Sequence, residues 1–113
     1  MVIDLHAHVV LEESFGAAGE YGPELSSDEK VQDFKVGNYV MRVPYRRSVF
    51  MDAQKRVDAM DVLGIDLQLL SPNPLSFFGH INALDALEFA RASNDAMVTH
   101  IDPFKNRLLG AAS

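Results

Sequence analysis

Cysteine is absent from all 113 residues of the chain. A disulfide framework, a thiolate metal site and a cysteine nucleophile are therefore excluded. No apolar run approaches the roughly 18 residues that a membrane-spanning helix needs. No basic region precedes an apolar stretch at the N-terminus, so a signal peptide is not predicted. From these absences we expect a cytoplasmic protein that does not bind membranes.

Positive charge is also scarce. Ten Lys and Arg residues stand against sixteen Asp and Glu residues, which gives a formal net charge of −6. An acidic chain without a basic run is poorly suited to the phosphate backbone, so no nucleic-acid binding is expected. Hydrophobic residues make up 48% of the chain and charged residues 23%. These proportions and the length indicate one small globular domain.

The stretch IDLHAHVV near the N-terminus contains two histidines, His6 and His8. Its β-branched content and shortness predict a strand over residues 2–8. Because residues i and i+2 of a strand point to one face, both imidazoles should lie on the same side, together with Asp4. Two imidazole nitrogens on one face can converge on a single cation, and zinc binds nitrogen at about 2.0–2.1 Å. The simpler alternative is a pair of polar residues at the end of an edge strand.

Helix and strand patterns alternate along much of the remaining chain. Apolar residues at helical spacing, with Asp52 as a cap and Gly64 as a terminator, predict a helix within residues 51–64. A long second helix should precede Pro103. The expected strands are residues 2–8, 65–71 and 107–112, and the expected helices lie within 51–64 and 81–102.

The segment between the first strand and the first helix gives weaker signals. Residues 11–35 are polar and rich in Gly, Ser and Glu, which predicts a long loop with a short helical turn over 27–31. The sequence VGNYVMRV, residues 36–43, predicts a small hairpin about Gly37-Asn38.

Strands alternating with helices favour a parallel sheet with right-handed crossovers, the three strands being adjacent in chain order. Function in such sheets collects at the carboxyl ends of the strands, where His6 and His8 lie. The third expected strand has no following helix to cover it, and a three-stranded sheet leaves an edge open. We therefore expect the first part of a larger barrel of about 250 residues, not a competent catalyst by itself.

Three segments together resemble the amidohydrolase superfamily: VIDLHAH, RVDAMDVLGIDLQLLSPNP and SNDAMVTHIDPFKNRLLGAAS. They are most similar to the branch that contains aminocarboxymuconate-semialdehyde decarboxylase and the related resorcylate- and carboxyvanillate-type decarboxylases. The resemblance covers most of the chain except residues 11–35. Besides the HxH motif, it is carried by Arg56, Met60, Asp61, Gly64, Ile65 and Asp66.

The resemblance implies an α/β fold, the N-terminal βαβαβ portion of a (β/α)8 TIM barrel. Residues 1–113 would then be the N-terminal part of a single metal-dependent hydrolase-like domain. A long loop and hairpin insertion would follow strand one, over about residues 11–50.

The resemblance also implies one divalent metal, zinc or, in some members, manganese. Only two of the family's ligands carry over to this sequence, His6 and His8. The other ligands, histidines and an aspartate from later strands, would follow Ser113. Catalytic zinc usually has three protein ligands, so the ligand set here is incomplete and no catalytic residue is assigned.

In this branch the implied activity is that of a carbon–carbon lyase, a non-oxidative decarboxylase acting on a small, planar, carboxylated substrate. A metal-dependent hydrolase of the same superfamily is the first alternative. The second is a non-catalytic βαβαβ module that binds a partner through its open sheet edge. Besides substrate, we expect the partner to be a second copy of the chain or the remainder of the same barrel.

Arg42, in YVMRVP, is similar in position to a family arginine that holds a substrate carboxylate. A guanidinium suits that role because it can bind a carboxylate through two hydrogen bonds. The match is displaced by about two residues relative to Asp52, so Arg46 and Arg47 compete for the role. A solvated basic turn is the simpler interpretation.

Phe77 and Phe78 follow the second expected strand, in a loop that would open onto the active-site face of a barrel. We assign Phe78 to the wall of the substrate pocket. The alternative is an anchor that packs the loop onto the rim. His80 and His100 are interpreted as structural or exposed, and His100 lies near a helix C-terminus, where positive charge is favoured.

Overall fold

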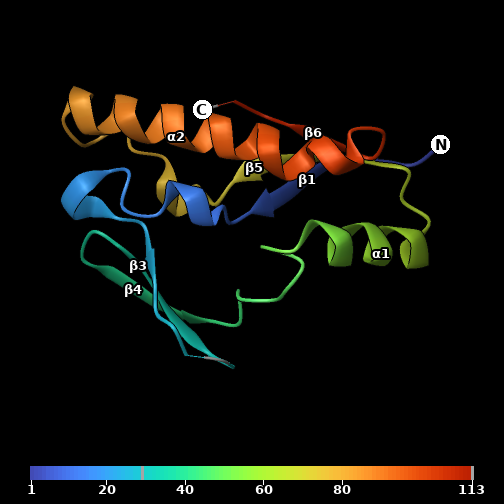
Figure 1. Cartoon of the computed structure of the whole chain (residues 1–113), viewed down its shortest axis with the longest axis horizontal. Coiled ribbons are helices and arrows are strands. Elements are labelled where there is room, and N and C mark those ends of the chain that lie inside the picture. Colours follow the sequence, from blue (N-terminus) through green and yellow to red (C-terminus); the bar gives the residue numbers. More distant parts are fainter. Residues whose placement is uncertain (29, 113) are drawn as a thin grey trace.

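The computed structural model describes residues 1–28 and 30–112, which form a mixed α/β structure. Strands β1 (Ile3–Val9), β5 (Leu67–Pro72) and β6 (Leu108–Gly110) form a parallel sheet in the order β1-β5-β6. This confirms the parallel arrangement and the order expected from the sequence. The sheet lies behind the long helix in Figure 1.

Both predicted helices are present, and their ends follow from their capping residues. Helix α1 (Ala53–Leu63) begins where the Asp52 side chain accepts a hydrogen bond from the Lys55 backbone N–H at 3.0 Å. It ends at Gly64, whose positive φ of 71° glycine adopts without steric cost. Helix α2 (Ala83–Ile101) is capped by Asn82 in the same way and is followed by a 3-10 turn that contains Pro103.

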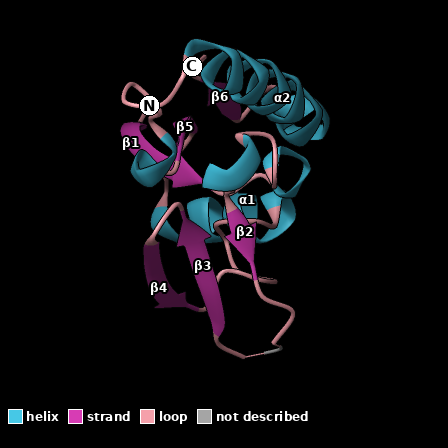
Figure 2. Cartoon of the chain, turned by 90° about the vertical axis from the view of Figure 1, so that its left-hand side faces the viewer, coloured by secondary structure: helices cyan, strands magenta, loops and turns pink. Residues whose placement is uncertain are grey.

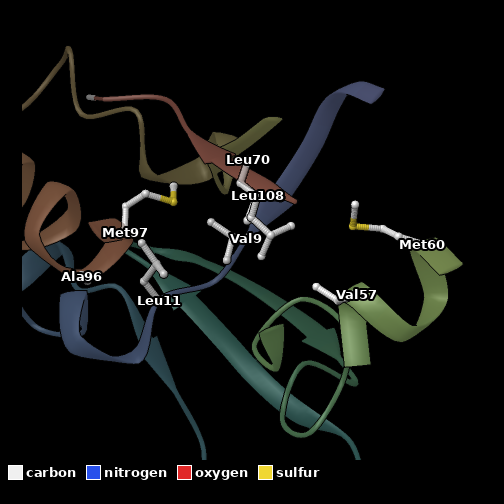
Figure 3. Packing of buried hydrophobic residues seen from close by; sticks show 8 residues of the cluster. All are labelled: Val9, Leu11, Val57, Met60, Leu70, Ala96, Met97 and Leu108. Carbon is white, nitrogen blue, oxygen red and sulfur yellow. The ribbon is translucent and has the colours of Figure 1, made fainter. Parts of the chain in front are cut away.

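Both helices pack on one face of the parallel sheet, where the main hydrophobic core lies (Figure 3). Alternate residues of each strand point to that face, and the helices contribute their apolar residues. The buried members of this core are Val9, Leu11, Val57, Met60, Leu70, Ala96, Met97 and Leu108. The contact with α2 is close at β6, because a Cβ at Gly110 would lie 2.5 Å from Cγ of Met97.

A second, antiparallel sheet lies to one side of the first (Figure 2). It consists of β2 (Glu24–Leu25), β3 (Gln32–Val36) and β4 (Tyr39–Val43). The predicted hairpin about Gly37-Asn38 is confirmed, since Val36 pairs with Tyr39 across that turn.

The long loop predicted over residues 11–35 is wrong in part, because it contains β2, β3 and two 3-10 turns. These strands are short and contain charged residues, so the alternation of apolar and polar residues in them is weak. Phe34 nevertheless anchors a separate core with Val10, Val43 and Tyr45. Residues 27, 28, 30 and 31 are not helical, and residue 29 of the expected turn lies outside the described residues.

Asp66 and Arg107 connect the strands of the parallel sheet at their amino ends. Asp66 accepts a hydrogen bond from the Val2 backbone N–H at 2.7 Å. Arg107, before β6, donates to the carbonyls of Ile65 and Asp66 and forms an ion pair with Asp61 at 2.8 Å. Within residues 1–28 and 30–112, no helix is both long enough and apolar enough to cross a membrane.

Candidate metal centre

His6 and His8 lie on the sheet face opposite the helices, near the carboxyl end of β1. Ser71, which pairs with His8 in β5, follows Leu70 of the helix-facing core and so points the other way. The two imidazole rings lie edge to face, with centroids 4.9 Å apart. Their Nε2 atoms are 3.1 Å apart. The predicted convergence of the two side chains is therefore present.

Ser71 forms a hydrogen bond with one of the two ring nitrogens of His8. Its Oγ lies 3.0 Å from His8 Nδ1 and 3.4 Å from the carbonyl oxygen of Ala7. A serine hydroxyl both donates and accepts, so it can accept from Nδ1–H of one His8 tautomer while it donates to the Ala7 carbonyl, or donate to the unprotonated Nδ1 of the other. In the first tautomer, Nε2 of His8 carries the lone pair, which can accept a hydrogen bond from His6 Nε2–H or bind a cation. In either tautomer the contact with Ser71 orients the His8 ring, and Nε2 lies beside His6.

The spacing of the two Nε2 atoms fits a shared divalent cation. Two nitrogens that each lie 2.0–2.1 Å from a tetrahedral zinc ion are about 3.3 Å apart, close to the 3.1 Å observed. Histidine nitrogens are common zinc ligands. The second ring nitrogen of such a histidine usually forms a hydrogen bond with a neighbouring oxygen. Among the described residues, no group of three or more His, Cys, Asp and Glu side chains could hold a metal ion. The described residues therefore offer this pair of nitrogens without a third His, Cys, Asp or Glu beside it.

A buried polar network lies behind the histidines, on the helix side of the sheet. Asp4 accepts hydrogen bonds from the His6 backbone N–H at 3.0 Å and from Gln68 Nε2 at 2.8 Å. Gln68 Oε1 accepts from Arg56 of α1 at 2.9 Å. A second guanidinium nitrogen of Arg56 donates to the His8 carbonyl oxygen at 2.6 Å.

The expectation that Asp4 shares a face with His6 is wrong. The pairing of β1 with β5 shifts between Asp4 and Ala7, so the regular alternation of side chains is broken there. Asp4 pairs with Gln68 and points with it toward α1. The hydrogen bond from the His6 backbone, followed by that from Gln68, lowers the pKa of the Asp4 carboxyl below its ordinary value. The carboxylate thus stays charged beside the buried guanidinium.

The predicted substrate arginine lies in the antiparallel sheet. Arg42 is exposed on β4 and forms an ion pair with Asp33 across the hairpin at 3.6 Å. Arg46 donates hydrogen bonds to the carbonyls of Leu25 and Ser26, so its guanidinium holds the loop before β3. A substrate-binding role for Arg42 stays a prediction.

Phe78 occupies the position expected of an anchor. Its ring is buried and packs edge to face on Phe89 of α2, with centroids 4.8 Å apart. The neighbouring ring of Phe77 is 57% exposed. The substrate-pocket role assigned to Phe78 stays a prediction, and Phe77 is the freer of the two rings.

The two remaining histidines differ in environment. His80 is exposed beside the ring of Phe78. His100 lies in the last turn of α2, where its Nε2 is buried and has no hydrogen-bond partner within residues 1–28 and 30–112. Burial, reinforced by the positive charge of Arg56, lowers the pKa of the His100 imidazole below its ordinary value. Desolvation therefore outweighs the favourable helix C-terminus considered from the sequence.

Sequence reasoning missed Ser71 and Gln68 as parts of the site. Both lie in β5, more than sixty positions from their partners in β1. Their proximity depends on the strand register, which the local sequence does not specify. Ser71 could have been found by asking which polar residue ends the neighbouring parallel strand.

No protein-family model matches the chain, and no curated protein is significantly similar to it. The assignment of function therefore depends on the geometry of the histidine pair and on the sequence motifs.

Proposed function

We propose that the chain carries the two-histidine part of a divalent metal centre in an amidohydrolase-like enzyme, with zinc or manganese as the metal. The observation that carries this proposal is the 3.1 Å separation of the His6 and His8 Nε2 atoms at the carboxyl end of β1. Catalytic groups collect at that end of the strands in parallel α/β proteins.

The arrangement of the elements supports a barrel context for this pair. Three parallel strands in chain order, with both helices on one face, are what a segment of a TIM barrel requires. In such a barrel the opposite face, with His6, His8 and Ser71, would line the interior. The second sheet would then be an insertion after the first strand.

The proposed reaction is the non-oxidative decarboxylation of a planar, carboxylated substrate. A bound metal of this kind supplies Lewis acidity and lowers the pKa of bound water. In this chain His6 and His8 would hold it, and Ser71 would orient the His8 ring. Arg42, or one of the arginines after it, would bind the substrate carboxylate. A hydrolase would use the same two ligands, so the histidines do not distinguish the two reactions.

Metal titration tests the site itself. We expect one Zn²⁺ or Co²⁺ per chain by calorimetry. His6→Ala and His8→Ala should each weaken metal binding by about tenfold or more, because even the loss of a residue that hydrogen-bonds to a metal ligand weakens binding by that much. His80→Ala is the matched control, because His80 is exposed and distant in sequence. Equal affinities of the wild type and the His6 and His8 variants would contradict the proposal.

The reaction class is tested with metal-loaded protein and planar aromatic carboxylates. Metal-dependent release of carbon dioxide would support the decarboxylase. Release of an amine or alcohol from amide or ester substrates, without carbon dioxide, would instead support the hydrolase.

A second candidate is a non-catalytic module, and the edge of the parallel sheet favours it. Ile3 and Leu5 of the edge strand β1 are 50% and 71% exposed, which leaves apolar surface beside an unpaired edge. Sedimentation analysis, with Leu5→Lys as the variant, tests this. Metal-independent self-association that the variant abolishes would favour the module over the enzyme.

A further inference from the structure

The His6-Ala7-His8 segment is held at both ends from the helix side of the sheet. At one end, Asp4 accepts the hydrogen bond of the His6 backbone N–H at 3.0 Å. At the other end, Arg56 donates to the His8 carbonyl oxygen at 2.6 Å. Gln68 joins the two, donating to Asp4 at 2.8 Å and accepting from Arg56 at 2.9 Å. One continuous chain of hydrogen bonds therefore spans the two histidines.

This network is costly for the fold alone. Arg56 is only 6% exposed, and its Nε is buried with no hydrogen-bond partner among the described residues. A buried guanidinium and an unsatisfied N–H both oppose folding, and apolar residues of similar volume often replace such groups without loss of stability. Orphaned buried donors call for an explanation beyond packing.

The backbone pairing of β1 explains why side-chain hydrogen bonds are needed to hold the His6-Ala7-His8 segment. The pairing of β1 with β5 is irregular between Asp4 and Ala7, so the ladder holds this part of β1 less regularly. Pro72, opposite Val9, has no backbone N–H to donate to β1. The Asp4 carboxylate and the Arg56 guanidinium provide hydrogen bonds to the backbone on either side of Ala7.

We propose that Arg56, acting through Gln68 and Asp4, is a positioning residue that sets the spacing and orientation of the His6 and His8 imidazoles. The inference rests on the proposed metal site, because the paired imidazoles are the groups it would position. A guanidinium is suited to this task, since its planar fork binds two acceptors in a fixed geometry. The ammonium of a lysine cannot bridge Gln68 and the His8 carbonyl in the same way.

The test compares Arg56→Met with Met60→Ala in the full chain. Met60 lies one helical turn further along α1 and is 2% exposed, and none of the four hydrogen bonds of the network involves it, so its truncation removes packing from the same helix but no hydrogen bond from the network. We expect Arg56→Met to weaken Co²⁺ binding by about tenfold or more, as outer partners of metal ligands do. Met60→Ala should leave the affinity within about twofold of wild type.

A second measurement needs no metal. In the metal-free chain, the ¹⁵N resonances of the His6 and His8 imidazoles should shift in Arg56→Met, and the His6 amide should exchange faster. Arg56→Lys, which keeps the charge, should give the same changes to a smaller degree and serves if Arg56→Met does not fold.

Unchanged imidazole resonances in both Arg56 variants would overturn the positioning role, as would an equal loss of Co²⁺ affinity in Met60→Ala. Failure of the wild type to bind any metal would instead overturn the proposed function. The ¹⁵N shifts would still show whether Arg56 positions the two rings.

Discussion

The two faces of the parallel sheet differ in how deeply their side chains are buried. On the helix face, Leu70 and Leu108 are fully buried, and Arg56, Gln68 and Asp4 form a connected network. On the opposite face, His6 is exposed, and it contacts the other imidazole. Leu109 on β6 is 47% exposed on that side.

This difference separates stability from chemistry within one sheet. Burial of apolar surface against α1 and α2 provides the folding free energy on the helix face. On the histidine face, the polar side chains of His6, His8 and Ser71 are exposed or half-buried, so a ligand from solvent can reach them. Substitutions on the helix face should therefore change stability strongly, whereas substitutions on the histidine face should change mainly metal binding.

The largest expected effect comes from two neighbouring leucines of β6. Leu108→Ala removes a side chain with no exposed surface and should lower the free energy of unfolding by about 2–5 kcal/mol. Leu109→Ala, on the half-exposed face, should lower it by much less, about 1 kcal/mol or below. Urea unfolding of both variants checks this. Equal losses would mean that the two faces do not differ as described.

The elements of the sheet and helices could be predicted because local signals define them. Asp52 and Gly64 limit α1 by a side-chain cap and a positive φ, which depend only on neighbouring residues. The strands β1 and β5 are short, and about half of their residues are Ile, Leu or Val. In contrast, β3 depends on its partner β4 and on Phe34, and its own sequence is mostly polar.

The site could be predicted only where the relevant spacing is local. His6 and His8 share a face because they are two residues apart in one strand. The Asp4 side chain points to the other face because the pairing of β1 with β5 is irregular there. No feature of residues 3–9 indicates this irregular pairing. Arg56 was recognised as part of a motif, but its contact with the His8 carbonyl spans 48 positions.

A change of pH should have an intermediate effect on the free energy of unfolding, through His100 on the helix side of the sheet. Burial lowers its pKa in the folded chain, whereas in the unfolded chain the pKa is near the ordinary value of about 6.5. The unfolded state therefore takes up the proton first as the pH falls. The contribution of neutral His100 to the free energy of unfolding is fully present above about pH 6.5. It is lost as the pH falls toward the pKa of His100 in the folded chain.

Replacement of His100 by Gln should reduce this pH dependence. The groups that act on His100 are Arg56, which opposes its protonation, and Glu13 and Asp52, which favour it. Urea midpoints measured from pH 7.5 to pH 5 should fall less in His100→Gln than in the wild type. His80→Gln, at an exposed site, should behave as the wild type does. A fall that is the same in all three proteins would assign the pH dependence to other groups.

The smallest effect on stability is expected at Ser71, on the histidine face. Its hydroxyl forms a hydrogen bond with His8 Nδ1 at 3.0 Å in a half-buried position. Ser71→Ala should change the free energy of unfolding by no more than about 0.5–1.5 kcal/mol, the net value of one hydrogen bond. It should nevertheless weaken Zn²⁺ binding by about 10–100-fold, because the His8 ring loses the partner that orients it.

Ser71→Thr provides the matched control, since it keeps the hydroxyl and suits a strand. Its Zn²⁺ affinity should remain close to that of the wild type, and its His8 Nδ1 resonance should match that of the wild type. If Ser71→Ala bound zinc as tightly as Ser71→Thr, the hydroxyl would not orient His8. If instead Ser71→Ala lost as much stability as Leu108→Ala, the two faces of the sheet would contribute to folding alike, and the separation of stability from chemistry would fail.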